Sequence, residues 1–290
     1  MTTGEYLAQF LDAFVVPFRA PNTVACYRRA FQSLPVAVLR TELPALTGLQ
    51  VQAAINQQAR AHPRAAQLTL TALHVAFARA VALGMLTRSP VDGCQKPAHH
   101  AAKAAVLTAD QLARYIDAAK AEPAYPLLLL MATCGLRRGE ALGLRWDCID
   151  LTGGVLHIRA QRMRVHHGYQ LRPLKSAASV RSLPLPAAVI GELQAVTVRS
   201  FSGFVVDMTP EALAKAHRRV LDRAALPCIT PHGLRHSMAT AAAAQGCPMK
   251  ILQAILGHSR FELTANLYAD HLGADALAPH LASLSVALMG

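Results

Sequence analysis

Apolar side chains recur at helical spacing through the first ninety residues of the chain. In the segment 65–83, for example, Leu70, Leu73 and Phe77 fall on one face of a helix that stops at Gly84. Such a period is typical of amphipathic helices that pack against one another. We predict four helices, which together form a compact bundle. They lie at residues 4–19, from Asn22 onward, at 47–60 and at 65–83.

This periodicity stops after residue 87. Residues 88–105 contain two prolines, a glycine and several basic residues, which is typical of a linker. We therefore predict a first domain at 1–90, a linker at 91–105 and a second domain at 106–290. The pair His99-His100 has no acidic or cysteine partner nearby in the sequence, so we interpret it as part of the linker rather than as a metal site.

The second domain contains both apolar patterns typical of helices and short segments typical of strands. The apolar stretch 124–136 is too short to span a bilayer and predicts a buried helix. Short segments at 154–160 and 180–185 predict strands, and residues 162–172 predict a hairpin around Gly168. Further helices are expected at 108–119, at 187–196, from Thr209 through Leu221, at 230–246, at 248–256 and at 274–289. The predicted fold is thus mainly α, with a helical bundle followed by a mixed α+β domain that has a small antiparallel sheet.

Composition narrows the class of protein. The chain has 290 residues, of which 53% are hydrophobic and 16% charged, so it can form two folded domains. Its net charge is +12, and 23 of its 29 basic residues are arginine, which suits bidentate phosphate contacts. A nucleic-acid partner is favoured. A basic protein from a GC-rich genome, in which arginine is simply frequent, remains the alternative.

Cysteine usage and the N-terminus bear on the compartment. The six cysteines show no Cys-x-x-Cys spacing, so we expect free thiols in a reducing cytoplasm. The first residues include Glu5 and Asp12 and have no basic region, so no signal peptide and no membrane association are expected.

A set of side chains suited to phosphate chemistry stands in the second domain. Cleaving a phosphodiester without a metal needs a hydroxyl nucleophile, arginines that neutralise the non-bridging oxygens, and an acid for the leaving oxygen. The candidates are Arg137 in Gly-Leu-Arg-Arg-Gly-Glu, Lys175 in Pro-Leu-Lys-Ser, His232 and Arg235 in His-Gly-Leu-Arg, His258 in Leu-Gly-His-Ser, and Tyr268.

The order of these motifs resembles the tyrosine recombinase (phage integrase) family, and more closely its simple two-domain members. The resemblance is specific over 130–150, 170–185 and 230–270, and loose over 1–90. It implies a core-binding domain and a catalytic domain that form a clamp around DNA, a 3′-phosphotyrosine intermediate, and no metal, cofactor or ATP. The implied roles are phosphate clamps for Arg137 and Arg235, nucleophile for Tyr268, general acid for Lys175, proton acceptor or phosphate ligand for His232, hydrogen-bond donor for His258, and support for Glu140 and His236.

Each assignment has a simpler rival. Arg137, beside Arg138, could be a solvated helix start, and Tyr268 could be a packed core tyrosine. His258 could lie against the negative end of a helix. His232 and His236, four residues apart on one helix, could suggest a zinc pair, but no glutamate stands between them and no third ligand is near. Lys175 is the hardest to assign, because Arg172 and Arg181 are close to it in sequence.

The favoured function is site-specific DNA recombination. We expect double-stranded DNA with inverted-repeat core sites as the partner, a monomer in solution and a homo-tetramer on DNA. The helix at 274–289 would pack either on a neighbouring subunit or on its own domain. Two alternatives remain, a type IB topoisomerase-like enzyme that relaxes supercoils and a catalytically silent DNA-binding protein derived from an integrase.

Overall fold

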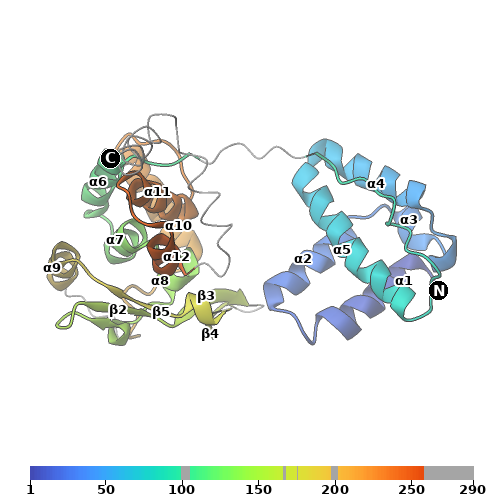
Figure 1. Cartoon of the computed structure of the whole chain (residues 1–290), viewed down its shortest axis with the longest axis horizontal. Coiled ribbons are helices and arrows are strands. Elements are labelled where there is room, and N and C mark those ends of the chain that lie inside the picture. The colour runs from blue at the N-terminus through green and yellow to red at the C-terminus, as the bar shows by residue number, and fades with distance from the viewer. Residues whose placement is uncertain (99–104, 166–167, 175, 197–201, 258–290) are drawn as a thin grey trace, which may run out of the picture. The chain divides into compact units, whose positions relative to one another are not determined.

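The computed structural model describes residues 1–98, 105–165, 168–174, 176–196 and 202–257. The chain divides into two compact units, Met1–Ala102 and Lys103–Gly290, each with its own hydrophobic core. Both units are mostly helical, and the second also contains small antiparallel sheets (Figure 1). The predicted fold class is confirmed.

The first unit is a helical bundle around aromatic and aliphatic side chains. Tyr6, Phe10 and Phe77 are buried in its centre, and the Tyr6 hydroxyl donates a hydrogen bond to the Ala76 carbonyl. Its α-helices are α1 (Thr3–Phe10), α2 (Pro21–Gln32), α3 (Val36–Arg40), α4 (Gly48–Ala61) and α5 (Pro63–Ala82).

Two details of this unit differ from the sequence-based prediction. The expected helix at 4–19 consists of α1 and a π-helical turn, Leu11–Val15, because Pro17 cannot donate to the helical ladder beyond it. The short α3, which the pattern did not predict, begins directly after Pro35 and buries Val38. The four predicted helices therefore become five within the described part of this unit.

Helix α5 is long and apolar enough to cross a membrane by length and composition. In the structure, however, one of its faces packs into the bundle, where Leu70, Leu73 and Phe77 are buried. This packing is typical of the central helix of a bundle.

The second unit is built around α7 (Tyr125–Cys134). Nine of its ten residues are buried, so helices pack on several of its sides, among them α6 (Ala109–Ala119) and α11 (Pro231–Ala244). Helix α6 starts with the predicted capping box, in which the Thr108 hydroxyl accepts from the Gln111 amide. The short α8 (Arg138–Leu142) follows α7 after three residues.

The predicted strands form two small antiparallel sheets along one side of this unit (Figure 1). Strand β2 (Val155–Ile158) pairs with β1 (Ile149–Asp150) and β5 (Arg181–Pro184), with Leu156 opposite Leu183 and Ile158 opposite Arg181. The predicted hairpin is formed by β3 (Ala160–Val165) and β4 (Gly168–Pro173).

Helices complete the unit on the other side of the sheets. They are α9 (Ala187–Ala195), α10 (Pro210–Arg223), α11 and α12 (Met249–Leu256). Each begins at or directly after a proline, which suits the first turn because it lacks the N–H that has no partner there. The helix predicted at 274–289 lies outside the described residues.

Candidate active site

The site begins where α7 ends. Gly135 adopts a left-handed conformation (φ 63°), which closes α7 and turns the chain toward α8. A side chain at this position would also collide with Met238 and Leu256. A glycine is therefore needed here on two counts, and the turn places Arg137 at the N-cap of α8.

Arg137 is held by its own helix and by a distant one. Its Nη1 donates to Glu140 Oε1 (2.6 Å), and its backbone N–H donates to Glu140 Oε2 (3.0 Å). Its Nη2 donates to the Gly257 carbonyl (3.2 Å). Its neighbour Arg138 is exposed, so the structure separates an anchored arginine from a solvated one.

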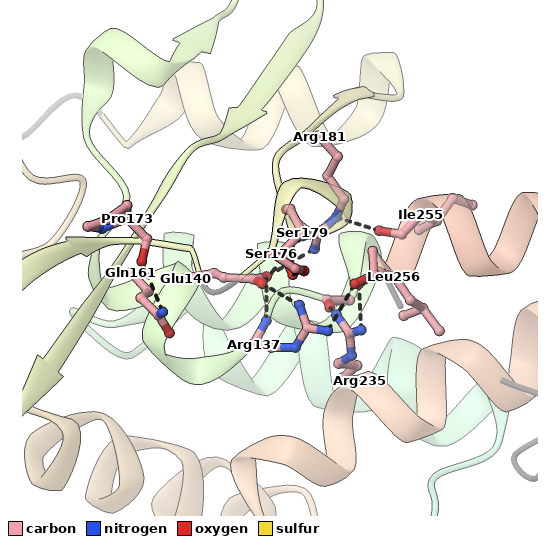
Figure 2. Close-up of polar contacts among 12 residues, drawn as sticks. Arg137, Glu140, Gln161, Pro173, Ser176, Ser179, Arg181, Arg235, Ile255 and Leu256 are labelled. Atoms are coloured by element: carbon pink, nitrogen blue, oxygen red, sulfur yellow. Dashed lines mark hydrogen bonds and ion pairs between the residues drawn. The ribbon is translucent and has the colours of Figure 1, made fainter. Parts of the chain in front are cut away.

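Arg235 comes from α11 and is almost fully buried (1% exposed). Its Nη1 donates to the Gly135 carbonyl and its Nη2 to the Leu256 carbonyl, both at 2.6 Å. Figure 2 shows Arg137 and Arg235 lying side by side between Glu140 and the end of α12. Residues about one hundred positions apart in the sequence thus meet at one place.

Glu140 is the carboxylate of this cluster and is 2% exposed. Besides Arg137, it accepts hydrogen bonds from Arg181 Nη1 (3.3 Å) and Nη2 (3.0 Å). Burial alone would raise the pKa of the Glu140 carboxyl, but the hydrogen bonds and charge of Arg181, together with those of Arg137, outweigh burial and lower it. Glu140 is therefore ionised and fixes both guanidinium groups.

Arg181 was not assigned a role from the sequence. Its side chain is 6% exposed, and its Nε also donates to the Ile255 carbonyl at 2.7 Å. The sequence contains a signal that Arg181 is buried, because Arg181 and Leu183 share one face of a strand and Leu183 is an apolar core residue. An arginine on the buried face of a strand requires a partner, and here the partner is Glu140.

The charges in this cluster do not balance. Arg137, Arg181 and Arg235 bring three positive charges to the single carboxylate of Glu140. Burial, with the nearby charge of Arg137, lowers the pKa of Arg235 to about 9, which still leaves it protonated at neutral pH. The excess positive charge favours binding of an anion at this place.

A buried network fixes the start of α11, which carries His232 and Arg235. His217 Nε2 lies 2.9 Å from the Ile229 carbonyl, which can only accept, so this nitrogen donates. His217 Nδ1 then accepts from the Tyr115 hydroxyl at 2.7 Å. The network holds the chain three residues before His232.

His232 and His236 lie one turn apart on α11, with their rings perpendicular and their centroids 4.5 Å apart. The His232 ring keeps access to solvent. Desolvation, together with the charges of His236, Arg235 and Arg137, nevertheless lowers its pKa to about 4, so it is neutral at pH 7. Within the described part of the chain, no group of three or more His, Cys, Asp or Glu side chains is arranged to hold a metal ion.

Three predicted site residues, Lys175, His258 and Tyr268, lie outside the described residues. Directly before His258, α12 is closed by Gly257, its C-cap, in a left-handed conformation (φ 62°). The structure thus brings together Arg137, Glu140, His232, Arg235 and His236 of the predicted set, and adds Arg181.

Comparison with known proteins gives concordant findings. The model of the Phage integrase family matches residues 105–274. A tyrosine recombinase XerC-like protein of Caldanaerobacter subterraneus subsp. tengcongensis is 29% identical over 192 residues, which cover 55% of this chain and 48% of that protein. The chain spans about half the length of the first curated relatives it matches.

Solved structures share the fold over nearly the whole chain. The Tn1549 transposon integrase, in complex with a circular intermediate DNA, has a TM-score of 0.85 at 20% identity, covering 98% of this chain and 99% of that one. A lambda integrase tetramer bound to a Holliday junction has a TM-score of 0.67 at 19% identity, covering 90% and 78% of the respective chains.

Proposed function

Since the chain belongs to the phage integrase family, we propose that it is a site-specific DNA recombinase that cleaves and rejoins strands through a phosphotyrosine. The partner is double-stranded DNA, and the reaction uses no metal and no ATP. Membership of the family indicates the class of reaction, and the side chains of the site indicate the role of each residue in it.

The observation that carries this proposal is the meeting of Arg137 and Arg235 in one buried cluster with excess positive charge. Each guanidinium carries five N–H donors, more than its contacts to Glu140 and backbone carbonyls use. The remaining donors can bind the two non-bridging oxygens of a phosphate, where negative charge gathers in the transition state. A preorganised clamp of this kind accelerates in-line displacement.

The chemical steps follow from the residue types. The Tyr268 hydroxyl attacks the scissile phosphorus, and its proton passes to the imidazole of His232, which is neutral at pH 7. The P–O bond to the 5′ oxygen breaks, and Lys175 gives that oxygen a proton. The product is a 3′-phosphotyrosine and a free 5′-hydroxyl, and attack by a 5′-hydroxyl on the phosphotyrosine reverses the step. His258 donates a hydrogen bond to a non-bridging oxygen.

The assembly is part of the same proposal. Residues 1–90 act as the core-binding domain and residues 106–290 as the catalytic domain, joined by the linker 91–105. A tetramer on two inverted-repeat core sites would perform the exchange, with residues 274–289 packing on a neighbouring subunit. The lambda integrase tetramer on a Holliday junction, which shares the fold, supports this assembly. The protein would act in the cytoplasm, where its six free cysteines stay reduced.

A trapped covalent adduct tests the proposal. Duplex DNA that flanks the gene, nicked near the scissile position so that cleavage cannot reverse, is incubated with the wild type, Tyr268→Phe and the control Tyr169→Phe. We expect a detergent-resistant, protease-sensitive adduct in the wild type and in Tyr169→Phe, and none in Tyr268→Phe. Tight DNA binding by the wild type without any adduct would favour a silent DNA-binding protein. Relaxation of plasmids that lack a specific site would favour a topoisomerase.

A further inference from the structure

Three arginines bind three consecutive carbonyls at the end of α12. Arg181 Nε donates to the carbonyl of Ile255 (2.7 Å), Arg235 Nη2 to that of Leu256 (2.6 Å), and Arg137 Nη2 to that of Gly257 (3.2 Å). The arginines come from β5, α11 and the N-cap of α8 (Figure 2).

These carbonyls form the negative end of a helix. The last carbonyls of an α-helix have no partner within the helix, and they carry part of the helix dipole. Guanidinium groups satisfy both the hydrogen bonds and the charge. The end of α12 is therefore fixed to the same arginine cluster in which we placed the phosphate clamp.

Arg181 differs from the other two arginines in its contacts. Its Nη1 and Nη2 both donate to Glu140, and Glu140 in turn accepts from both the backbone and the side chain of Arg137. Its Nε meanwhile holds α12. One planar side chain thus connects the carboxylate that positions Arg137 to α12, whose C-cap Gly257 directly precedes His258.

Close packing fixes the geometry of this connection. Gly257 is left-handed, and a Cβ there would lie 3.1 Å from Arg181 Nη1 and 3.0 Å from the Ala178 carbonyl. Arg181 Nη1 also donates to the Ser179 carbonyl at 3.0 Å, so its guanidinium is held from several directions. Lysine cannot reproduce this set, because it has a single nitrogen on a flexible stem.

We propose that Arg181 is a positioning residue for DNA cleavage. It holds Arg137 in place through Glu140, and it holds the end of α12 directly. The inference rests on the proposed recombinase function. Lysine in place of Arg181 keeps a positive charge beside Glu140, so we expect the unit to stay folded and to bind DNA, while the clamp and the end of α12 lose their alignment.

Hydrogen exchange on the protein alone provides the first test. Arg181→Gln and Arg181→Lys are compared with the control Arg223→Gln. In the control, one of the two arginines on the buried Glu122 is removed and Arg219 remains, just as Arg137 remains on Glu140 in the Arg181 variants. We expect exchange in peptides covering 135–142 and 249–257 to rise about tenfold or more in both Arg181 variants, the effect of losing a charge-assisted hydrogen bond. The control should leave these peptides unchanged. Unchanged exchange in the Arg181 variants would overturn the inference, whether or not a cleavable DNA is found.

Single-turnover cleavage provides the second test, on a nicked duplex that gives an adduct with the wild type. We expect Arg181→Lys to lower the cleavage rate about 10²-fold, as misplacement of a catalytic group by about 1 Å can do, with the Kd for DNA and the unfolding midpoint close to those of Arg223→Gln. A wild-type rate in Arg181→Lys would refute the positioning role and leave the recombinase proposal standing. A joint loss of affinity, midpoint and rate would show a purely structural role. Absence of an adduct in the wild type would count against the recombinase proposal, and exchange would still decide the role of Arg181.

Discussion

Replacing Glu140 by glutamine tests the charge balance of the site in the free protein. Glutamine keeps the shape of the side chain but removes the negative charge between Arg137 and Arg181. The amide NH₂ of glutamine would also face the guanidinium N–H groups of the arginines, which can only donate hydrogen bonds. Breaking a buried ion pair by removing one partner costs about 3–5 kcal/mol, because the other charge stays buried without compensation. We expect this loss in the free energy of unfolding.

The control for this prediction is Glu122→Gln. Glu122 is also buried and paired with two arginines, but the side chains of Arg219 and Arg223 are 56% and 43% exposed, against 6% for Arg181. Water screens the exposed charges, so we expect a smaller loss of about 1–2 kcal/mol. Chemical denaturation of all three proteins gives the free energies. By calorimetry, the loss at Glu140 should lower the unfolding midpoint by roughly 6–20 °C for a unit of this size.

The pH dependence of this difference follows from the lowered pKa of Glu140. A carboxyl whose pKa is lowered on folding stabilises the folded state above its unfolded value, here 4.5, and the stabilisation is lost as the pH falls through the folded-state value. The free energies of unfolding of the wild type and Glu140→Gln should therefore differ by the full amount at pH 7 and become equal in acid. A loss below about 1 kcal/mol at neutral pH, or a loss equal to that of Glu122→Gln, would refute the reasoning.

Three further predictions concern the surroundings of the site. The pKa of His232, followed by NMR, should lie near 4, and because the folded state disfavours its protonated form, the free energy of unfolding should fall as the pH drops from about 6.5 toward 4; a pKa above 6 would contradict the partial desolvation of the ring and its closeness to Arg235 and Arg137. Gly135→Ala should destabilise the protein by about 2–3 kcal/mol, against about 1 kcal/mol for Gly84→Ala, where the backbone is also left-handed but no neighbour is near; equal losses in denaturation curves would argue against the clash. Tyr115→Phe should cost about 1–3 kcal/mol, because it leaves the buried Nδ1 of His217 without its donor; an unchanged midpoint in urea would count against this network.

Much of the fold can be predicted from the spacing of apolar residues and from the glycines and prolines that end helices and strands. The apolar period predicts the helices at 47–60 and 65–83, Gly84 marks the end of the second, and Gly168 marks the hairpin. The short α3 escaped because five residues carry too little periodicity to distinguish a helix from a turn. The break after α1 could not be placed because a π-helical turn has no pattern of its own.

The site could be predicted only as a set of residue types in order. The resemblance to the tyrosine recombinase family implies one site for Arg137, Glu140 and Arg235, and the structure brings them together. The sequence does not show that the guanidinium groups of Arg137 and Arg235 meet at the end of α12, because that contact depends on how α8, α11 and α12 pack. Arg181 was considered only as a neighbour of Lys175, since its role depends on which face of β5 is buried.

The most direct test of the account is the chemical identity of the bond between protein and DNA. The adduct from the nicked duplex, formed in EDTA without ATP, is digested with trypsin and nuclease and analysed by mass spectrometry. We predict a single modified peptide in which Tyr268 carries the 3′-phosphate of the cleaved strand. Attachment at another residue, a 5′ linkage, or cleavage that requires added metal would contradict the account.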